Sequence, residues 1–200
     1  TNIYGIETNL PFLREVYAYL NETNSWSTTK TLENLSIDIP ALEVLDGGFH
    51  STIQDFPGRI GYWGVGVPPS GAMDTLSSRL ANKLLGNSME APVIELTLSG
   101  GKWLFRGAMQ IALTGADLQP KLDGRPIPMF QPIQVKAGQI LSFGEMVSGM
   151  RTYLAIEQGF DVSKVLGSAS CFTLGNFGGK NGRTLRTGDI LHPLAKKSSE

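Results

Sequence analysis

The sequence contains a single cysteine, Cys171, and two histidines, His50 and His192, among its 200 residues. One cysteine cannot form an internal disulfide, and the two histidines lack the spacing of a metal site. The chain also lacks a run of about 18 apolar residues, the length that a membrane-spanning helix needs, and a basic-then-apolar signal segment. We therefore expect a soluble, cytoplasmic protein with no bound metal and no membrane partner.

Neither sign of charge dominates the chain. Its 17 basic and 18 acidic residues nearly cancel and are spread along the sequence. Without a basic face, nucleic acid is not an expected partner. Hydrophobic residues make up 41% of the chain, enough for the core of one domain, or of one domain with a piece of another. Small neutral ligands are the partners that this composition favours.

The usual catalytic motifs are absent as well. The glycine-rich run Gly58–Gly66 lacks the G-x-G-x-x-G order of dinucleotide-binding loops, and Gly179-Lys180 is followed by Asn181 where a P-loop has serine or threonine. No G-x-S-x-G elbow surrounds Ser70, and the zinc motif H-E-x-x-H does not occur. Because these motifs are absent, the sequence gives no support to nucleotide binding, serine hydrolysis or zinc catalysis.

The first forty residues differ in character from the rest. They contain one glycine, and their apolar residues recur at helical spacing, at Leu10, Leu13, Val16, Tyr17 and Leu20. This pattern predicts one amphipathic helix, capped near residue 8 or 9. Sequence of another kind begins after Pro40. We therefore divide the chain into residues 1–40 and 41–200.

Short apolar runs alternate with glycine-rich turns after residue 40, which predicts a mainly β fold, an antiparallel barrel or sandwich. The expected strands are 41–45, 93–98, 110–114, 133–135, 140–143 and 153–156. Asp123-Gly124 predicts a hairpin turn, and 136–139 predicts a second hairpin between the strands at 133–135 and 140–143.

One helix is expected among these strands. Leu76, Leu80 and Leu84 fall on one helical face, Asp74 can cap the start, and Gly86-Asn87 can end it. Just before it, the segment GVPPSGAMD at 66–74 combines two prolines, two glycines, a serine and an aspartate. Prolines fix the backbone and glycines free it. We expect a rigid loop that positions Ser70 and the start of the helix.

Polar residues that can carry chemistry gather around this loop. They are Gln54, Asp55, Arg59, Ser70, Asp74, Arg79, Glu95 and Asp117. Structural roles compete for several of them. Asp74 can be a helix cap, which is compatible with pointing the helix start at an anion; Arg79 is expected to form a structural ion pair; Asp117 can form a turn at a strand end. Glu95 lies inside an apolar run, so its face is either solvated or lines a pocket.

Six segments, in order, resemble the carboxyltransferase domain of urea carboxylases. They are Thr52–Trp63, Gly66–Asp74, Leu80–Asn82, Gly86-Asn87, Leu113–Asp117 and Gly175–Arg183. The same domain is similar to one of the proteins that make up bacterial 5-oxoprolinases. The resemblance implies a cyclophilin-like antiparallel β-barrel with one or two short helices. The segment 4–14 looks like the end of a biotin carboxylase domain, which implies that residues 1–40 are its C-terminal helical tail and favours urea carboxylase over 5-oxoprolinase.

The resemblance also implies a reaction, the transfer of CO₂ from carboxybiotin to a nitrogen of urea to give allophanate. Urea presents two NH₂ groups and a carbonyl, so its recognition needs carboxylate acceptors and an N–H donor. The expected catalytic residues are Asp74, Asp55 and Arg59. The expected substrate-binding residues are Gln54, Ser70, Gly71, Glu95 and Asp117.

Biotin on its carrier, and the ATP and bicarbonate used by a biotin carboxylase domain, are implied to belong to other domains. The chain contains no Met-Lys-Met biotinylation motif and ends within the family's domain, so we expect no complete reaction from these 200 residues alone. The remaining carboxyltransferase half and the biotin carboxylase domain are the implied protein partners. The sequence departs from the family pattern at 157–159 and 168–171, so the resemblance assigns no binding role to those residues. The family's other members leave two alternatives open, a 5-oxoprolinase component and a non-catalytic binding or regulatory module.

Overall fold

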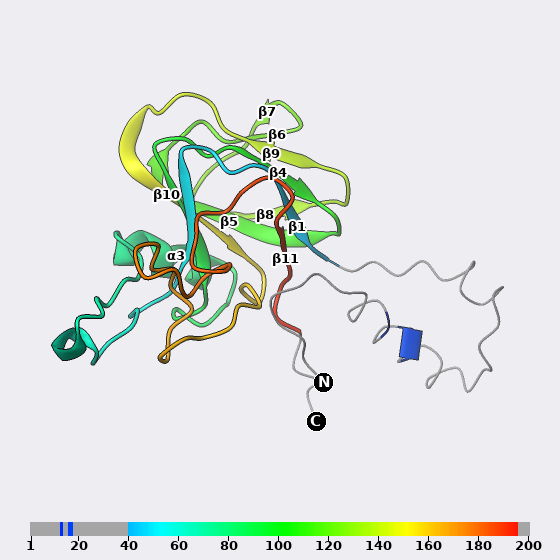
Figure 1. Cartoon of the computed structure of the whole chain (residues 1–200). Helices are drawn as coiled ribbons and strands as arrows, with labels where there is room; N and C mark the ends of the chain where they lie inside the picture. Colours follow the sequence, from blue (N-terminus) through cyan, green and yellow to red (C-terminus); the bar gives the residue numbers. More distant parts are fainter. Residues whose placement is uncertain (1–12, 14–15, 18–39, 196–200) are drawn as a thin grey trace. The chain divides into compact units, whose positions relative to one another are not determined.

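The computed structural model describes residues 13, 16–17 and 40–195 (Figure 1). The chain divides into two compact units, Thr1–Ile39 and Pro40–Glu200. In the first unit Leu13, Val16 and Tyr17 are helical; the rest of the predicted amphipathic helix lies outside the described residues. No helix within the described ranges is long and apolar enough to cross a membrane.

The second unit is built from two antiparallel sheets, which confirms the predicted mainly β fold. In order, the first sheet contains β11 (Ile190–Leu191), β1 (Leu42–Asp46), β4 (Lys102–Phe105), β9 (Ile140–Ser142), β6 (Lys121–Leu122) and β7 (Arg125–Pro126). The second contains β2 (His50–Gln54), β3 (Val93–Thr97), β10 (Ser148–Ile156), β5 (Met109–Asp117) and β8 (Pro132–Val135). Among the described strands, no ladder of hydrogen bonds closes the two sheets into a single ring.

The main core lies between the two sheets and follows the alternation of side chains along each strand. Every second residue of a strand points to the same face, and the inward set is fully or almost fully buried. From the first sheet it includes Leu42, Val44, Trp103 and Phe105, and from the second Ile53, Ile94, Leu96, Ile111, Leu113, Leu154 and Ile156. Burying this apolar surface is the main driving force of the fold.

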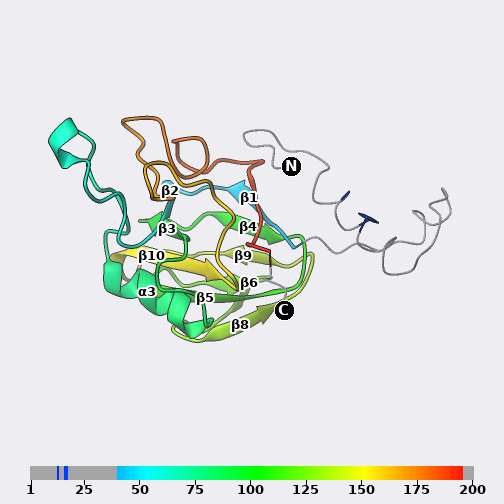
Figure 2. The ribbon, with the colours of Figure 1, turned by 90° about the horizontal axis from the view of Figure 1, so that it is seen from below.

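The other face of the second sheet is covered by the helix α3 (Thr75–Leu84), which packs on β10 and β5 (Figure 2). A second, smaller apolar cluster forms there from Ala72, Ala81, Val93, Tyr153 and Ala155. Because this sheet is covered on both faces, all five residues of β3 are buried. That explains why the segment around Glu95 reads as an almost continuous apolar run.

Helix α3 forms where the sequence predicts it, but it buries a different face. Asp74 is the N-cap, and the helix ends before Gly86, whose φ is +70°. Leu76 is 75% exposed, so the expected leucine face does not enter the core at this position. The buried residues are Ser78, Ala81 and Asn82. Their small or polar side chains allow a close approach to the sheet, and the Asn82 amide donates to the carbonyl of Ala91 at 2.8 Å.

One predicted hairpin is confirmed and the other is wrong. Asp123 and Gly124 have φ values of +49° and +78° and join β6 to β7, as their sequence predicts. The turn at 136–139 joins β8 to β9, which belong to different sheets. β8 pairs with β5, and β9 pairs with β4 and β6. Local sequence marks the turn correctly, whereas the strand partners are chosen by the core on each side of it.

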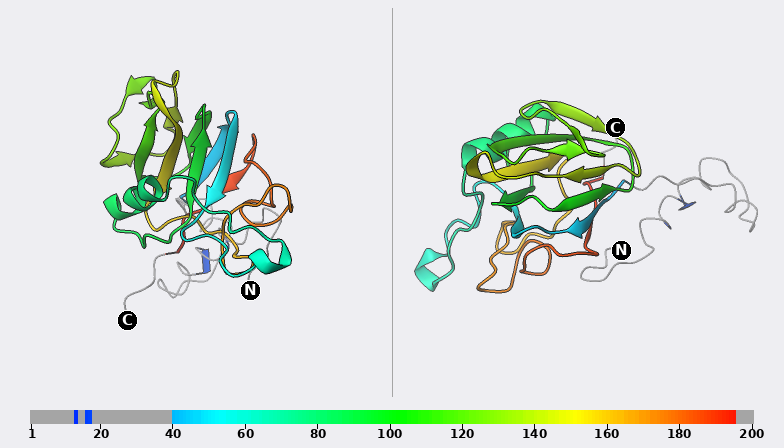
Figure 3. Two further views of the ribbon diagram at one scale, coloured as in Figure 1. Left: turned by 90° about the vertical axis from the view of Figure 1, so that its left-hand side faces the viewer. Right: turned by 90° about the horizontal axis from the view of Figure 1, so that it is seen from above.

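Residues 55–74, between β2 and α3, form a long loop that extends away from the sheets of the second unit, and we call this loop the arm. The segments on its two sides run next to each other and carry the short 3-10 helix η1 (Trp63–Val65) at the far end (Figure 3). Ile60, Trp63 and Val65 on this arm are 64%, 73% and 77% exposed. The arm therefore keeps large apolar side chains in solvent while its base is packed against the sheet.

Glycine at position 101 tests how tightly β1 and β4 approach each other. Gly101 has φ +68°, and a Cβ there would overlap the carbonyl oxygen of Asp46. Gly138 has φ +83° with no atom within 4 Å of its Cβ position. We expect Gly138→Ala to cost about 1 kcal/mol from the left-handed backbone alone, and Gly101→Ala to cost more than twice that. Urea unfolding of both variants measures this, and equal losses would contradict the steric explanation.

Candidate functional site

Asp55 is the most completely bonded carboxylate at the base of the arm. It follows β2, is 5% exposed and precedes the cis peptide bond between Phe56 and Pro57. Its carboxylate accepts hydrogen bonds from the hydroxyls of Ser168 and Ser170, each at 2.6 Å, and from the amide of Ala169 at 2.7 Å. Its own amide donates to the Ser170 hydroxyl at 2.9 Å. Asp55 thus joins β2 to a segment more than a hundred residues away.

Arg59 extends this connection with its guanidinium group. Nε donates to the carbonyl of Val165 at 3.0 Å and Nη2 to that of Ser170 at 2.8 Å, and the guanidinium carbon lies 4.7 Å from the centre of the Phe177 ring. Burial lowers the pKa of Arg59, and the negative charge of Asp55 partly offsets this. Arginine nevertheless remains a cation in proteins, so Arg59 stays a charged donor enclosed by the fold.

The second side of the arm is held to the first through Ser70 and Gly71. The Gly71 amide donates to the side-chain oxygen of Gln54 at 3.1 Å, and the Arg59 amide donates to the carbonyl of Pro69 at 2.5 Å. The Ser70 hydroxyl lies 3.5 Å from Nη1 of Arg59. Five predicted site residues are therefore in one hydrogen-bonded group: Gln54, Asp55, Arg59, Ser70 and Gly71.

Glu95 fixes the place where the arm enters α3. Its carboxylate accepts from the Met73 amide at 2.7 Å and from the Tyr153 hydroxyl at 2.8 Å, and Arg151 lies 3.3 Å away as an ion pair. The Tyr153 oxygen in turn accepts from the Asp74 amide at 2.7 Å. Burial raises the pKa of Tyr153 and the Glu95 charge raises it further. The phenol therefore keeps its proton, and Glu95 is fully engaged inside the fold rather than solvated.

Asp74 differs from these residues because its side chain is exposed. Its carboxylate accepts from the Ser77 amide at 3.0 Å and the Ser77 hydroxyl at 2.5 Å. Burial raises the pKa of this carboxyl, but the hydrogen bonds from Ser77 and the Leu76 amide outweigh it, so the pKa of Asp74 is lowered. Asp74 is an ionised helix cap that also faces solvent, so a ligand can reach it.

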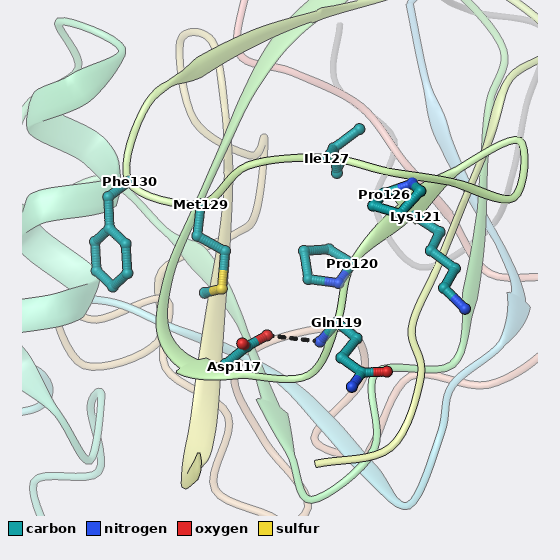
Figure 4. Close-up of a pocket in the computed structure, with 8 residues that line it drawn as sticks. All are labelled: Asp117, Gln119, Pro120, Lys121, Pro126, Ile127, Met129 and Phe130. Atoms are coloured by element: carbon teal, nitrogen blue, oxygen red, sulfur yellow. Dashed lines mark hydrogen bonds between the residues drawn. The ribbon is translucent and has the colours of Figure 1, made fainter. Parts of the chain in front are cut away.

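Asp117 lies apart from this group, at the end of β5. Its carboxylate accepts from the Gln119 amide at 2.8 Å, the turn contact expected for an aspartate at a strand end. It lines a pocket of about 420 Å³ whose other walls are Gln119, Pro120, Lys121, Pro126, Ile127, Met129 and Phe130 (Figure 4). Neither Asp55 nor Asp74 is among the residues that line this pocket.

The ion pair expected for Arg79 is not found among the residues that the structure describes. Its guanidinium carbon lies 4.6 Å from the centre of the Phe56 ring, and Nη2 is 3.6 Å from the sulfur of Met89. The helix turns this side chain toward the aromatic residue that follows Asp55. An aromatic face occupies the place that a carboxylate was expected to take.

Sequence reasoning missed the residues that complete the group, namely Ser168, Ser170, Tyr153, Arg151 and Phe177. They come from segments distant in the chain from Asp55 and Glu95, and their residue types are common in any β protein. The spacing of Ser168 and Ser170 was one available signal, because residues two apart in an extended chain share a face.

The C-terminal segment carries a charged pair of its own. Arg183 contacts both carboxylate oxygens of Asp189, at 2.6 and 2.7 Å. Burial raises the pKa of Asp189, but hydrogen bonds from Arg183 and the Arg186 amide, with the positive charges of Arg183 and Lys180, outweigh it, so the pKa falls below the usual 3.8. A carboxyl whose pKa is lower in the folded state than in the unfolded state stabilises the protein when the pH is above the unfolded-state pKa.

That pair predicts an acid-dependent loss of stability. The stabilisation from ionised Asp189 is complete above pH 3.8 and disappears as the pH falls through the lower, folded-state pKa. The free energy of unfolding should therefore exceed that of Asp189→Asn at neutral pH, and the difference should shrink below pH 3.8. Denaturant unfolding of both proteins across the acid range measures this. A constant difference at every pH would contradict it.

Asp55→Asn tests the connection at the base of the arm. The amide NH₂ of asparagine cannot accept the hydrogen bonds that a carboxylate oxygen accepts here. A buried donor left without its partner costs roughly 1–3 kcal/mol, and more for charged groups, so we expect a loss of about 2 kcal/mol or more. Asp117→Asn is the matched control, because its one backbone contact can be kept by the amide oxygen. Chemical unfolding measures the free energy of unfolding of both variants. Similar losses in the two variants would contradict a stabilising role for the hydrogen bonds of Asp55.

Comparisons with known proteins place this geometry in a family. Residues 65–200 match the family model described as carboxyltransferase domain, subdomain A and B. Urea amidolyase of Saccharomyces cerevisiae is 46% identical over 191 residues, which is 96% of this chain and 10% of that protein. A 5-oxoprolinase subunit of Haemophilus influenzae is 39% identical over 150 residues, 75% of this chain and 48% of that one.

A solved structure agrees with these sequence matches. The crystal structure of urea carboxylase from Kluyveromyces lactis superposes with a TM-score of 0.87 at 44% identity, over 96% of this chain and 17% of that one. The chain thus spans a small part of the two yeast relatives, 10% and 17% of their length, and about half of the 5-oxoprolinase subunit. Because the family model covers residues 65–200 and the fold agrees over almost the whole chain, this protein belongs to the carboxyltransferase domain family that urea carboxylases and 5-oxoprolinase subunits share.

Proposed function

We propose that this chain is part of a urea carboxylase and contributes to transferring a carboxyl group from carboxybiotin to a nitrogen of urea, giving allophanate. The observation that carries the proposal is the 46% identity to a urea amidolyase over 96% of the chain. That match extends well beyond the 75% of the chain that matches the 5-oxoprolinase subunit.

Asp74 is the residue that we assign to the substrate. Its carboxylate is ionised and exposed, and the described residues that donate to it are Ser77, through its amide and hydroxyl, and Leu76, through its amide. Carboxylate oxygens have up to four acceptor positions, so Asp74 can accept from a urea NH₂ and take its proton as general base. When bound, carboxybiotin would supply the activated carboxyl group for the same nitrogen.

Asp55 and Arg59 are assigned a positioning role in this proposal. Their polar atoms are bonded to Ser168, Ser170 and Val165 and are buried, which leaves them little capacity for a substrate. Arg59 contacts the Pro69 carbonyl and the Ser70 hydroxyl, and the Asp55 carbonyl accepts from the Ala72 amide, so both residues hold the loop that leads into Asp74. Catalytic groups must be held within fractions of an ångström of the productive geometry, and this connected turn supplies that rigidity.

Other domains would supply what this chain does not carry. We propose that biotin sits on a separate carrier, that ATP and bicarbonate are used by a biotin carboxylase domain, and that residues 1–40 are the end of that domain, in a cytoplasmic enzyme. The exposed Ile60, Trp63 and Val65 fit a contact with the remaining carboxyltransferase half, since large apolar side chains gathered on a surface mark interaction sites.

A 5-oxoprolinase component is the second candidate function. The 39% identity to a 5-oxoprolinase subunit over 150 residues favours it. Glutamate formation from 5-oxoproline and ATP, measured with the neighbouring gene products, would identify this activity. Urea-dependent ATP hydrolysis in the full-length polypeptide would identify a urea carboxylase.

Asp74→Asn separates the substrate role from the capping role. Asparagine caps a helix about as well as aspartate, so the thermal midpoint should be nearly unchanged. Loss of a positioned base lowers a rate by roughly 10²-fold or more, and we expect that loss in carboxyl transfer to urea by the full-length polypeptide. Carboxylation of biotin, carried out elsewhere, should proceed normally.

Asp123→Asn is the matched control for this experiment. Asp123 is an exposed aspartate that accepts backbone and side-chain hydrogen bonds from Ile140 and Gln139 in a hairpin, far from the arm in sequence. The Asp123→Asn substitution should leave the rates of both biotin carboxylation and carboxyl transfer to urea unchanged. Near-normal transfer by Asp74→Asn would remove Asp74 from the catalytic residues.

A further inference from the structure

Arg79 is a partly exposed cation, and no described residue gives it an oxygen partner. Its Nε is buried and donates no hydrogen bond, and its Nη2 lies 3.6 Å from the sulfur of Met89. Thioether sulfur is a weak acceptor. The guanidinium carbon lies 4.6 Å from the centre of the Phe56 ring, so one face of the group is supported while its N–H edge is poorly satisfied.

The other packed arginines of the described chain do not share this state. Arg59 donates to two backbone carbonyls. Arg183 contacts both oxygens of Asp189. Arg151 has a buried Nε that makes no hydrogen bond, but this atom lies 3.3 Å from a Glu95 oxygen, so it has an anionic neighbour. Burying a donor without an acceptor costs free energy, which makes the exception at Arg79 a feature that requires an explanation.

The position of Arg79 connects it to the candidate site. It lies on α3, the helix that Asp74 caps, and it stacks on Phe56, the residue next to Asp55. Aromatic stacking fixes the plane of a guanidinium and leaves its edge free to donate. Because Nε is buried, the edge that a ligand can reach is the Nη1–Nη2 end, whose two N–H groups match the two oxygens of a carboxylate.

We propose that Arg79 binds a planar carboxylate-type anion, such as a carboxylate, carbamate or bicarbonate, with the edge of its guanidinium. The identification of this anion with the carboxyl group being transferred rests on the proposed function. The anion class itself does not, because it follows from the unpaired N–H edge and its support by Phe56. Arg79 would then hold the anionic partner while Asp74 receives the neutral one.

Formate and bicarbonate are the probes that test this assignment. Each sodium salt is titrated into the chain at constant ionic strength, with chloride as the balancing anion, and the thermal midpoint is followed. A ligand that binds the folded state raises the midpoint with its concentration, which gives an apparent Kd. ¹³C line broadening of labelled formate provides a second measurement that does not depend on unfolding.

Arg79→Gln and Arg79→Lys are compared with Arg106→Gln. Arg106 is a half-exposed arginine paired with Glu43 on the first sheet, so it matches the change in charge at a distance from the site. We expect the apparent Kd to rise about tenfold or more in Arg79→Gln, since a charge-assisted bidentate contact is lost. Arg79→Lys should weaken binding less, and Arg106→Gln should not change it. Circular dichroism checks that each variant folds.

Two outcomes would overturn the inference: no binding of either anion by the unaltered chain, or equal binding by the folded Arg79 variants. Neither outcome depends on carboxyl transfer. Transfer to urea is measured separately in the full-length polypeptide. Anion binding through Arg79 without transfer would reject the proposed function and keep the binding site, whereas transfer without binding at Arg79 would do the reverse.

Discussion

The hydrogen bonds received by the Asp55 carboxylate are the constraint on which the candidate site depends. A buried carboxylate is tolerated only when its oxygens are satisfied, and here two serine hydroxyls and a backbone amide satisfy them. These donors lie more than a hundred residues along the chain. Because the Asp55 carboxylate needs these donors, the segment at 168–170 must lie beside it. The same segment supplies the Ser170 carbonyl that accepts a hydrogen bond from Arg59.

The arm inherits its order from this connection. Its two sides are bonded to each other through Gln54 and Gly71, and its far side runs directly into Met73 and Asp74, whose amides are bonded to Glu95 and Tyr153. Prolines at positions 68 and 69 restrict the backbone between these points. Buried polar groups thus hold the loop that leads into the exposed cap Asp74 and also the backbone of Asp74 itself, although the Asp74 side chain makes few contacts.

Local sequence predicted what local physics controls. The hairpin at Asp123-Gly124 and the capped start of α3 depend on backbone geometry and hydrogen bonds within a few residues, and both were predicted. The partners of Asp55 and Glu95 depend on tertiary packing, so the sequence identified the carboxylates but not Ser168, Ser170 or Tyr153. The buried face of α3 was missed for the same reason: close packing on a sheet selected Ala81 over the exposed Leu76. For Arg79, an expected ion pair gave way to Phe56, a neighbour that spacing alone does not reveal.

The bond between Glu95 and Tyr153 has a consequence for how the chain avoids mispairing. The two residues lie directly opposite each other on β3 and β10, on the face that meets α3. Sliding one strand by a single residue would turn its polar member to the opposite face, among Ile94, Leu96 and Leu154, where a carboxylate or phenol finds no partner. A slip by two residues would keep the face but separate the pair. The polar contact therefore penalises both alternative alignments, which purely apolar strands of this length would tolerate more easily.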